Sequence, residues 1–180
     1  MEHPDTIGAM ASLATTYWRL GKYTEAEKLE IQVLDASNKI LGVEHPDTIT
    51  AIENLAITYQ NLEKYTQAEM LEIQVLDARS SILGVEHPDT IGAMASLATT
   101  YWRLGKYTEA EKLEMQVLDA NNRILGVEHP DTIRAIASLA STYGDLGKYT
   151  EAEKLEMQVL DTSNEFLEWN TQTQLGQWQV

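Results

Sequence analysis

A strict internal period dominates this sequence. The phrase His-Pro-Asp-Thr begins at His3, His45, His87 and His129, a spacing of 42 residues each time. The copies align without gaps, and residues 1–42 differ from residues 85–126 at only four positions. A fixed period of this length indicates an array of similar units, each of which packs mainly on its neighbours.

Each unit predicts two helices. In the first unit a helix over residues 4–20 is predicted by apolar side chains at the spacing of one helix face: Ile7, Met10, Leu13, Ala14, Tyr17 and Leu20. Pro4 suits its first position, because a proline N–H would be unpaired there anyway. Gly21 ends this helix, and Thr24 with Glu27 predicts a capping box that starts a second helix over residues 24–41. Equivalent pairs are expected at 46–62 and 66–83, 88–104 and 108–125, and 130–146 and 150–167.

A single helix pair is too small to bury both of its apolar faces, so the units must stack. Small residues that permit close helix approach recur in every copy, as at Ala9, Ala14 and Ala26. The sequence therefore predicts an all-α solenoid with four repeats, at 1–42, 43–84, 85–126 and 127–167.

The composition narrows the classes of partner. The formal charge of −15 opposes binding to a phosphate backbone, which argues against nucleic acid. No apolar run reaches the roughly 20 residues that a membrane helix needs. The absence of cysteine excludes thiolate chemistry and, with the lack of a signal peptide, favours a cytoplasmic location.

The repeated residues resemble the tetratricopeptide repeat. The resemblance rests on Leu-small-x-x-Tyr, Gly-x-Tyr and Ala positions, found at Leu13, Ala14, Tyr17, Gly21, Tyr23 and Ala26. The long period is similar to arrays in kinesin light chains and in fungal NOD-like-receptor NTPases. The resemblance implies a right-handed superhelical solenoid of antiparallel helix pairs that binds proteins or peptides. It departs at Glu63, where the glycine of the turn is replaced, which we expect to weaken one turn at most.

The last stretch of the chain does not follow the period. One nucleotide string that encodes residues 165–180 and a stop encodes RILGVEHPDTIGAMASL when it is read one base earlier, a phrase made of residues 123–133 and 8–13. We therefore expect residues 168–180 to be a tail derived from a frameshift, and the ancestral array to have been longer. The tail is expected to lie against the open face of the last helix pair.

Two sets of residues, the histidines and the repeated acidic residues, could suggest metal binding or catalysis. Each histidine stands just before a helix start, where we expect it to take part in capping. Equivalent atoms of neighbouring repeats are too far apart to share a metal ion, so no metal or cofactor is expected. Glu27, Glu30 and Asp35 recur along the second helix and are interpreted as a solvated face, since no nucleophile accompanies them. No enzymatic activity is expected.

Differences between the copies form one stripe along the first helix of each unit, at unit positions 8, 11, 12, 15, 18 and 19. By resemblance to tetratricopeptide arrays this stripe lines a concave groove that binds a peptide, with these candidate residues: Thr15, Trp18, Arg19, Glu53, Ile57, Gln60, Asn61, Thr99, Trp102, Arg103 and Arg134. Tryptophan and arginine often anchor interfaces, which favours groove contact for Trp18 and Trp102. Packing against the adjacent repeat and neutral drift remain alternatives.

The function that follows is a binding scaffold without chemistry of its own. Arg19, Arg103 and Arg134 outnumber Glu53 and Asp145 on the stripe, so the expected ligand is a protein or peptide with an acidic residue and an apolar anchor. Two alternatives belong to another class: a structural array that associates head to tail, or the sensor arm of a larger receptor NTPase.

Overall fold

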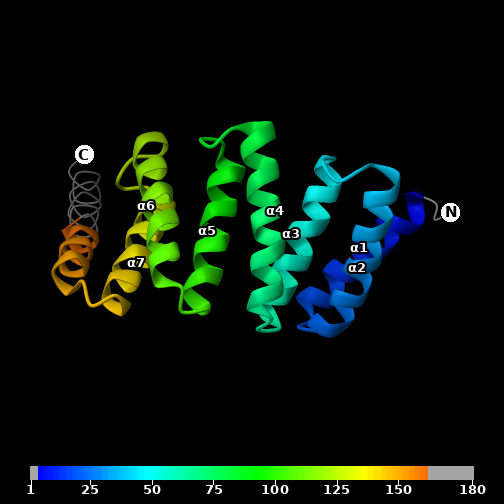
Figure 1. The fold of residues 1–180 in the computed structure, drawn as a ribbon, viewed down its shortest axis with the longest axis horizontal. Coiled ribbons are helices and arrows are strands. Elements are labelled where there is room, and N and C mark those ends of the chain that lie inside the picture. The colour runs from blue at the N-terminus through cyan, green and yellow to red at the C-terminus, as the bar shows by residue number, and fades with distance from the viewer. Residues whose placement is uncertain (1–3, 162–180) are drawn as a thin grey trace, which may run out of the picture. The chain divides into compact units, whose positions relative to one another are not determined.

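The computed structural model describes residues 4–161, and within this range the chain forms eight α-helices and no β-strand. Seven of the helices have both ends in the described range (Figure 1): α1 (Pro4–Arg19), α2 (Tyr23–Ile40), α3 (Pro46–Asn61), α4 (Tyr65–Leu83), α5 (Pro88–Arg103), α6 (Tyr107–Ile124) and α7 (Pro130–Asp145). An eighth helix begins at residue 149 and continues to residue 161. The predicted all-α array of helix pairs is confirmed. The predicted tail at 168–180 and its expected position lie outside the described residues.

The first helix of each repeat begins as the sequence predicts. In α3, α5 and α7 the residue before the helix is a histidine whose Nδ1 accepts a hydrogen bond from the backbone N–H two residues later, at 3.1–3.2 Å. Proline follows at the first helical position, where no N–H partner is needed. The histidines at 45, 87 and 129 are therefore helix caps.

The predicted start of the second helix was wrong. Lys22, Lys64 and Lys106 are the capping residues, without a side-chain hydrogen bond, and Thr24 lies inside the helix rather than at its cap. The cause is the tightness of the turn. Gly21 adopts a left-handed conformation (φ 71°), and the N–H of Lys22 closes back on the carbonyl of Tyr17 at 2.9 Å. The chain therefore enters the next helix at once, before a Thr24 cap can form.

By its contacts the chain divides into two units, residues 1–105 and 106–180. In the first unit each helix packs on the next in chain order, from α1 to α5 (Figure 1). Alanine permits this close approach, since Ala26 and Ala68 are completely buried. A cluster of Ile49, Ile52, Val75 and Ala93 fills the space between α3, α4 and α5.

In the second unit α6 packs on α7. Ala110 from α6 is completely buried, and Ile136 and Leu139 of α7 are almost completely buried. The same kinds of residue, at the same positions of the repeat, therefore form the interior of both units.

Helix α1 differs from α5 in its surroundings although the two have the same 16-residue sequence. Leu97 of α5, which packs against α4, is 2% exposed, whereas its equivalent Leu13 in α1 is 44% exposed. The same difference separates Thr100, which is buried, from Thr16, which is exposed. One face of α1 is thus left uncovered by the described residues.

Candidate functional site

Most of the predicted groove residues lie together in the first unit, on α1, α3 and α5, which are the first helices of the first three repeats. They border two hollows. The α1–α3 hollow has a volume of about 170 Å³ and is lined by Thr15, Trp18, Glu30, Asn54 and Ile57. Its aromatic wall is Trp18, which is 36% exposed and meets Tyr23 edge to face at 6.1 Å between ring centroids.

The second hollow lies between the ends of α3 and α5, with Tyr65 of α4 at its border. This α3–α5 hollow also measures about 170 Å³, and its lining residues are Gln60, Asn61, Tyr65, Thr99, Thr100 and Arg103. Arg103 places its guanidinium 5.1 Å from the centre of the Trp102 ring, a cation–π arrangement that orients both side chains at the end of α5.

Four predicted groove residues do not line either hollow: Trp102, which stacks with Arg103, and Glu53, Arg134 and Arg19. Glu53 forms a two-pronged ion pair with Arg79, at 2.9 and 2.7 Å, and Arg79 also donates to the backbone carbonyl of Asp89. This pair joins α3, α4 and α5, so the Glu53 charge is already neutralised. Arg134 belongs to the second unit and pairs with Asp131 at 3.0 Å on α7. Arg19 is exposed at the end of α1.

The interpretation of Glu30 as part of a solvated face was wrong. Glu30, Glu72 and Glu114, which occupy the same position in three repeats, are only 7%, 4% and 6% exposed. Burial raises the pKa of each carboxyl above its ordinary value of 4.5, because it removes water from the charged form. Among the described residues, the Oε2 atom of each has no hydrogen-bond partner.

A threonine from the next repeat faces each of these carboxyls. The nearby hydroxyl groups of Thr58, Thr100 and Thr142 lower the pKa of Glu30, Glu72 and Glu114 respectively and partly offset the effect of burial. The buried glutamate therefore belongs to the contact between successive repeats.

Glu72 receives further donors. Its Oε1 accepts the Gln60 amide at 2.7 Å and the Ser96 hydroxyl at 2.6 Å. The Gln60 amide also lies 2.9 Å from the Thr100 hydroxyl oxygen. Side chains of α3, α4 and α5 thus form one network around this carboxylate.

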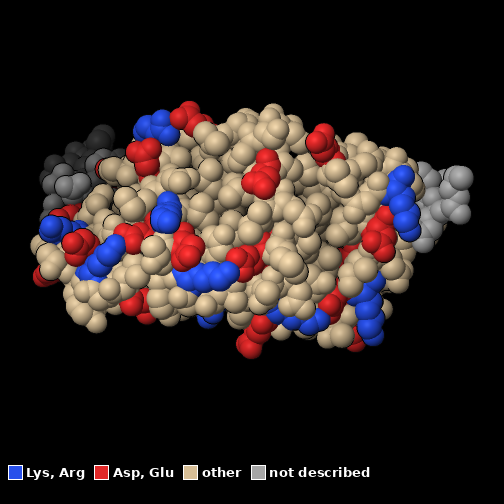
Figure 2. All heavy atoms as spheres, in the orientation of Figure 1, with Lys and Arg blue, Asp and Glu red and all other residues tan. Residues whose placement is uncertain are grey.

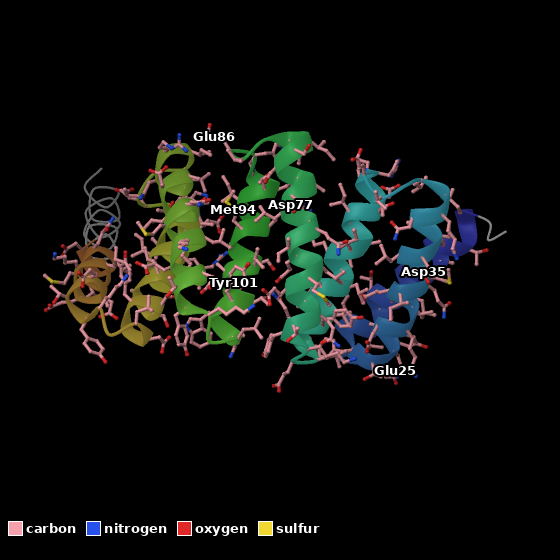
Figure 3. The ribbon with its side chains drawn as sticks, in the orientation of Figure 1. Glu25, Asp35, Asp77, Glu86, Met94 and Tyr101 are labelled. Atoms are coloured by element: carbon pink, nitrogen blue, oxygen red, sulfur yellow. The ribbon has the colours of Figure 1, made fainter. Side chains whose placement is uncertain are left out.

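The interpretation as a solvated face is also wrong for Glu27 and its equivalent Glu111, which form ion pairs. Glu27 pairs with Lys64 at 2.7 Å and Glu111 pairs with Lys148 at 2.6 Å, so each pair links one repeat to the next. Only the third position of the supposed solvated face fits that interpretation, since Asp35 on α2 and Asp77 on α4 are exposed (Figure 3).

A signal for the buried glutamate was present in the sequence. Glu30 stands four residues after Ala26 and three before Val33, which is the spacing of one helix face, and both neighbours are buried. A polar residue on the apolar stripe of a helix indicates a buried polar contact rather than a solvated face.

The surface charges, the possible metal ligands and the helix lengths bear on whether the described residues form other kinds of site. On the visible face, acidic and basic side chains lie interspersed (Figure 2). In residues 4–161 no three histidine, aspartate or glutamate side chains come together as metal ligands. No helix in the same range is long and apolar enough to cross a membrane.

Comparison with solved structures supports the fold. BtubC (BKLC) from P. vanneervenii is similar with a TM-score of 0.82 and 19% identity, over 92% of this chain and 66% of that one. Nearly identical TPR-like repeats of a Podosopora anserina putative kinesin light chain match with a TM-score of 0.59 and 25% identity, over 92% and 99%. A Rap protein complexed with Competence and Sporulation Factor gives 0.69 and 16%, over 92% and 45%.

This chain therefore spans less than two thirds of the BtubC and Rap chains. A search of curated proteins gave no match. The sequence profile of the tetratricopeptide repeat matches residues 5–81, 49–122 and 96–165, which together include nearly the whole array. The chain belongs to the tetratricopeptide repeat family.

Proposed function

We propose that this chain is a non-catalytic scaffold that binds a protein or peptide along α1, α3 and α5. The observation that carries the proposal is the position of the variable residues. Side chains that differ between otherwise similar repeats line two adjacent hollows in the first unit, each large enough for a side chain of a ligand. Variation between repeats at such positions gives successive hollows different chemistry, as selective recognition of an extended ligand requires.

The two hollows suit different groups. Trp18 and Ile57 offer an apolar wall for an anchoring side chain in the α1–α3 hollow. Arg103 borders the α3–α5 hollow and supplies a fixed positive charge for an acidic residue of the ligand. Among the structural relatives, the Rap protein is complexed with Competence and Sporulation Factor, which supports a binding role for this kind of array.

Selection from a random peptide library on the immobilised protein tests this proposal. A selected peptide is then titrated into ¹⁵N-labelled protein. Amide signals of α1, α3 and α5 around the two hollows should shift, whereas the exposed positions of α2 and α4 should not. Shifts confined to α2 and α4 would contradict the groove proposal.

A second candidate function, self-association, is supported by the uncovered face of α1. Its equivalent in α5 is buried against α4, the second helix of the preceding repeat. Because α1 and α5 have the same sequence, the second helix of another copy would fit the same face. Sedimentation velocity should then show a larger species as concentration rises, and Leu13→Glu should abolish it. A concentration-independent monomer would exclude this function.

A further inference from the structure

The first two repeats differ in the side chains that surround their buried glutamate. Glu30 and Glu72 occupy equivalent positions, and each approaches the first helix of the next repeat. At Glu72 the protein provides its own nitrogen donor, the Gln60 amide, 2.7 Å from Oε1. The repeat position of Gln60 is occupied by Trp18 in the preceding repeat, and an indole there cannot deliver the same two-hydrogen amide.

The Gln60 amide fills the space beside Glu72, whereas the equivalent space beside Glu30 is part of the α1–α3 hollow. Glu30 is one of its lining residues and is more than nine-tenths buried. Its Oε2, like that of Glu72, has no hydrogen-bond partner among the described residues, so the two repeats differ in the Gln60 amide, which Trp18 replaces in α1. Lys64 does not serve as the donor for Glu30, because its ammonium already binds both oxygens of Glu27 at 2.7 Å. A buried carboxylate that lacks the amide donor present in the next repeat gains from a donor that a ligand supplies.

The lining of this hollow selects among donors. Trp18 provides an aromatic face and Ile57 an apolar surface, while Thr15 and Asn54 add neutral polar groups. A carboxylate next to an indole favours a cation over a neutral amide, because charge–charge and cation–π attraction then act together.

We infer that the α1–α3 hollow binds a cationic side chain of a peptide ligand, the ammonium of a lysine or the guanidinium of an arginine, with Glu30 as acceptor and Trp18 as the aromatic wall. This inference rests on the proposed groove function and specifies one of its subsites. The complete ligand would then present a basic residue to the α1–α3 hollow and an acidic residue to Arg103 at the α3–α5 hollow.

Matched peptides test the subsite directly. Acetyl-Gly-Lys-Gly-amide and its norleucine counterpart, which has an uncharged side chain of similar length, are titrated while the indole N–H signals of ¹⁵N-labelled protein are recorded. The lysine peptide should bind at least tenfold more tightly than the norleucine peptide and should shift the Trp18 signal. Equal affinity for the two peptides would overturn the inference.

Two variants separate the carboxylate from general packing. Glu30→Gln keeps the shape but removes the charge, and should weaken lysine-peptide binding about tenfold or more. Trp18→Gln reproduces the arrangement at Glu72, where an internal amide fills the site, and should also abolish the lysine preference. Melting curves check that both variants remain folded. A lysine preference that survives Glu30→Gln would overturn the inference.

The reverse substitution should create a new binding site. Gln60→Trp removes the internal donor at Glu72 and should create a second site for the lysine peptide, seen as shifts around Ser96 and Thr100. If library-selected peptides bind along α1, α3 and α5 but the lysine peptide does not discriminate, the subsite is wrong and the groove function stands. If selected peptides bind elsewhere while the lysine peptide still requires Glu30, the groove function fails and the cation site stands.

Discussion

Gln60 donates its side-chain amide to Oε1 of Glu72 at 2.7 Å, which links the end of α3 to the middle of α4. Because Glu72 also accepts from Ser96 of α5, one buried carboxylate joins three helices of two successive repeats. Polar groups, and not only apolar packing, thus help to hold neighbouring repeats together.

Removal of the Gln60 amide should destabilise the first unit. We expect Gln60→Ala to lower the free energy of unfolding by about 1–3 kcal/mol, since it withdraws a donor from a buried charged group. Urea unfolding measures the change. Gln74→Ala, on the exposed side of α4, is the control and should have little effect. Equal effects of the two substitutions would contradict a structural role for the network.

The identical helices α1 and α5 provide a matched test of stacking. Leu97→Ala should cost about 2–5 kcal/mol, because it leaves a cavity against α4, whereas Leu13→Ala should cost well under half as much. Chemical denaturation of the two variants gives the comparison. Similar losses would mean that the uncovered face of α1 is covered in solution, as self-association requires, and the loss at Leu13 should then depend on protein concentration.

Glu63 is expected to be a site of local strain. It has φ 57°, the left-handed conformation that Gly21, Gly105 and Gly147 adopt in the equivalent turns. Glu63→Gly should therefore raise the free energy of unfolding by up to about 1 kcal/mol, the difference between relieved strain and added chain entropy. Glu63→Ala retains a Cβ and should not stabilise the protein. If glycine stabilises no more than alanine, the turn at Glu63 is unstrained.

The fold could be predicted from the sequence because the signals that specify it are local and occur in every repeat. Pro46 at a helix start and Gly42 at a helix end determine the backbone near themselves, whatever packs around them. The predicted Thr24 cap failed because the left-handed Gly21 places Lys22 at the helix start, and this depends on the geometry of the whole turn.

The candidate site was only partly predictable, because its floor comes from the second helix of each pair. Position-by-position variation identified Trp18 and Gln60 on the first helices, which line the hollows. Glu30 does not vary, so that criterion could not find it. Its place on the apolar stripe indicated burial, but its neighbour Thr58 lies in the next repeat, 28 positions along the chain, and the local pattern does not identify that contact.

The buried glutamates should make stability depend on pH. Burial raises the pKa values of Glu30, Glu72 and Glu114 in the folded state, so these carboxyls bind protons more tightly in the folded than in the unfolded chain. Their stabilising contribution is complete below the ordinary value of 4.5 and is lost as the pH rises through the raised values. Glutamine imitates the protonated acid at every pH.

Melting temperatures of the wild type and of a triple variant, Glu30→Gln with Glu72→Gln and Glu114→Gln, test this dependence between pH 8 and pH 5. The melting temperature of the wild type should rise relative to that of the variant as the pH falls. A difference that stays constant over this range would show that the three carboxyls titrate alike in the folded and unfolded chains.

The most direct measurement of the groove function is the affinity of a library-selected peptide for the wild type and for the double variant Trp18→Ala with Trp102→Ala. Each central anchor should be worth about 2 kcal/mol or more, so calorimetry should show a loss of roughly 30-fold or more for each Trp that contacts the ligand. The melting temperature should change much less than the affinity. A double variant that binds the peptide normally but melts far below the wild type would contradict the account, because both tryptophans would then serve packing alone.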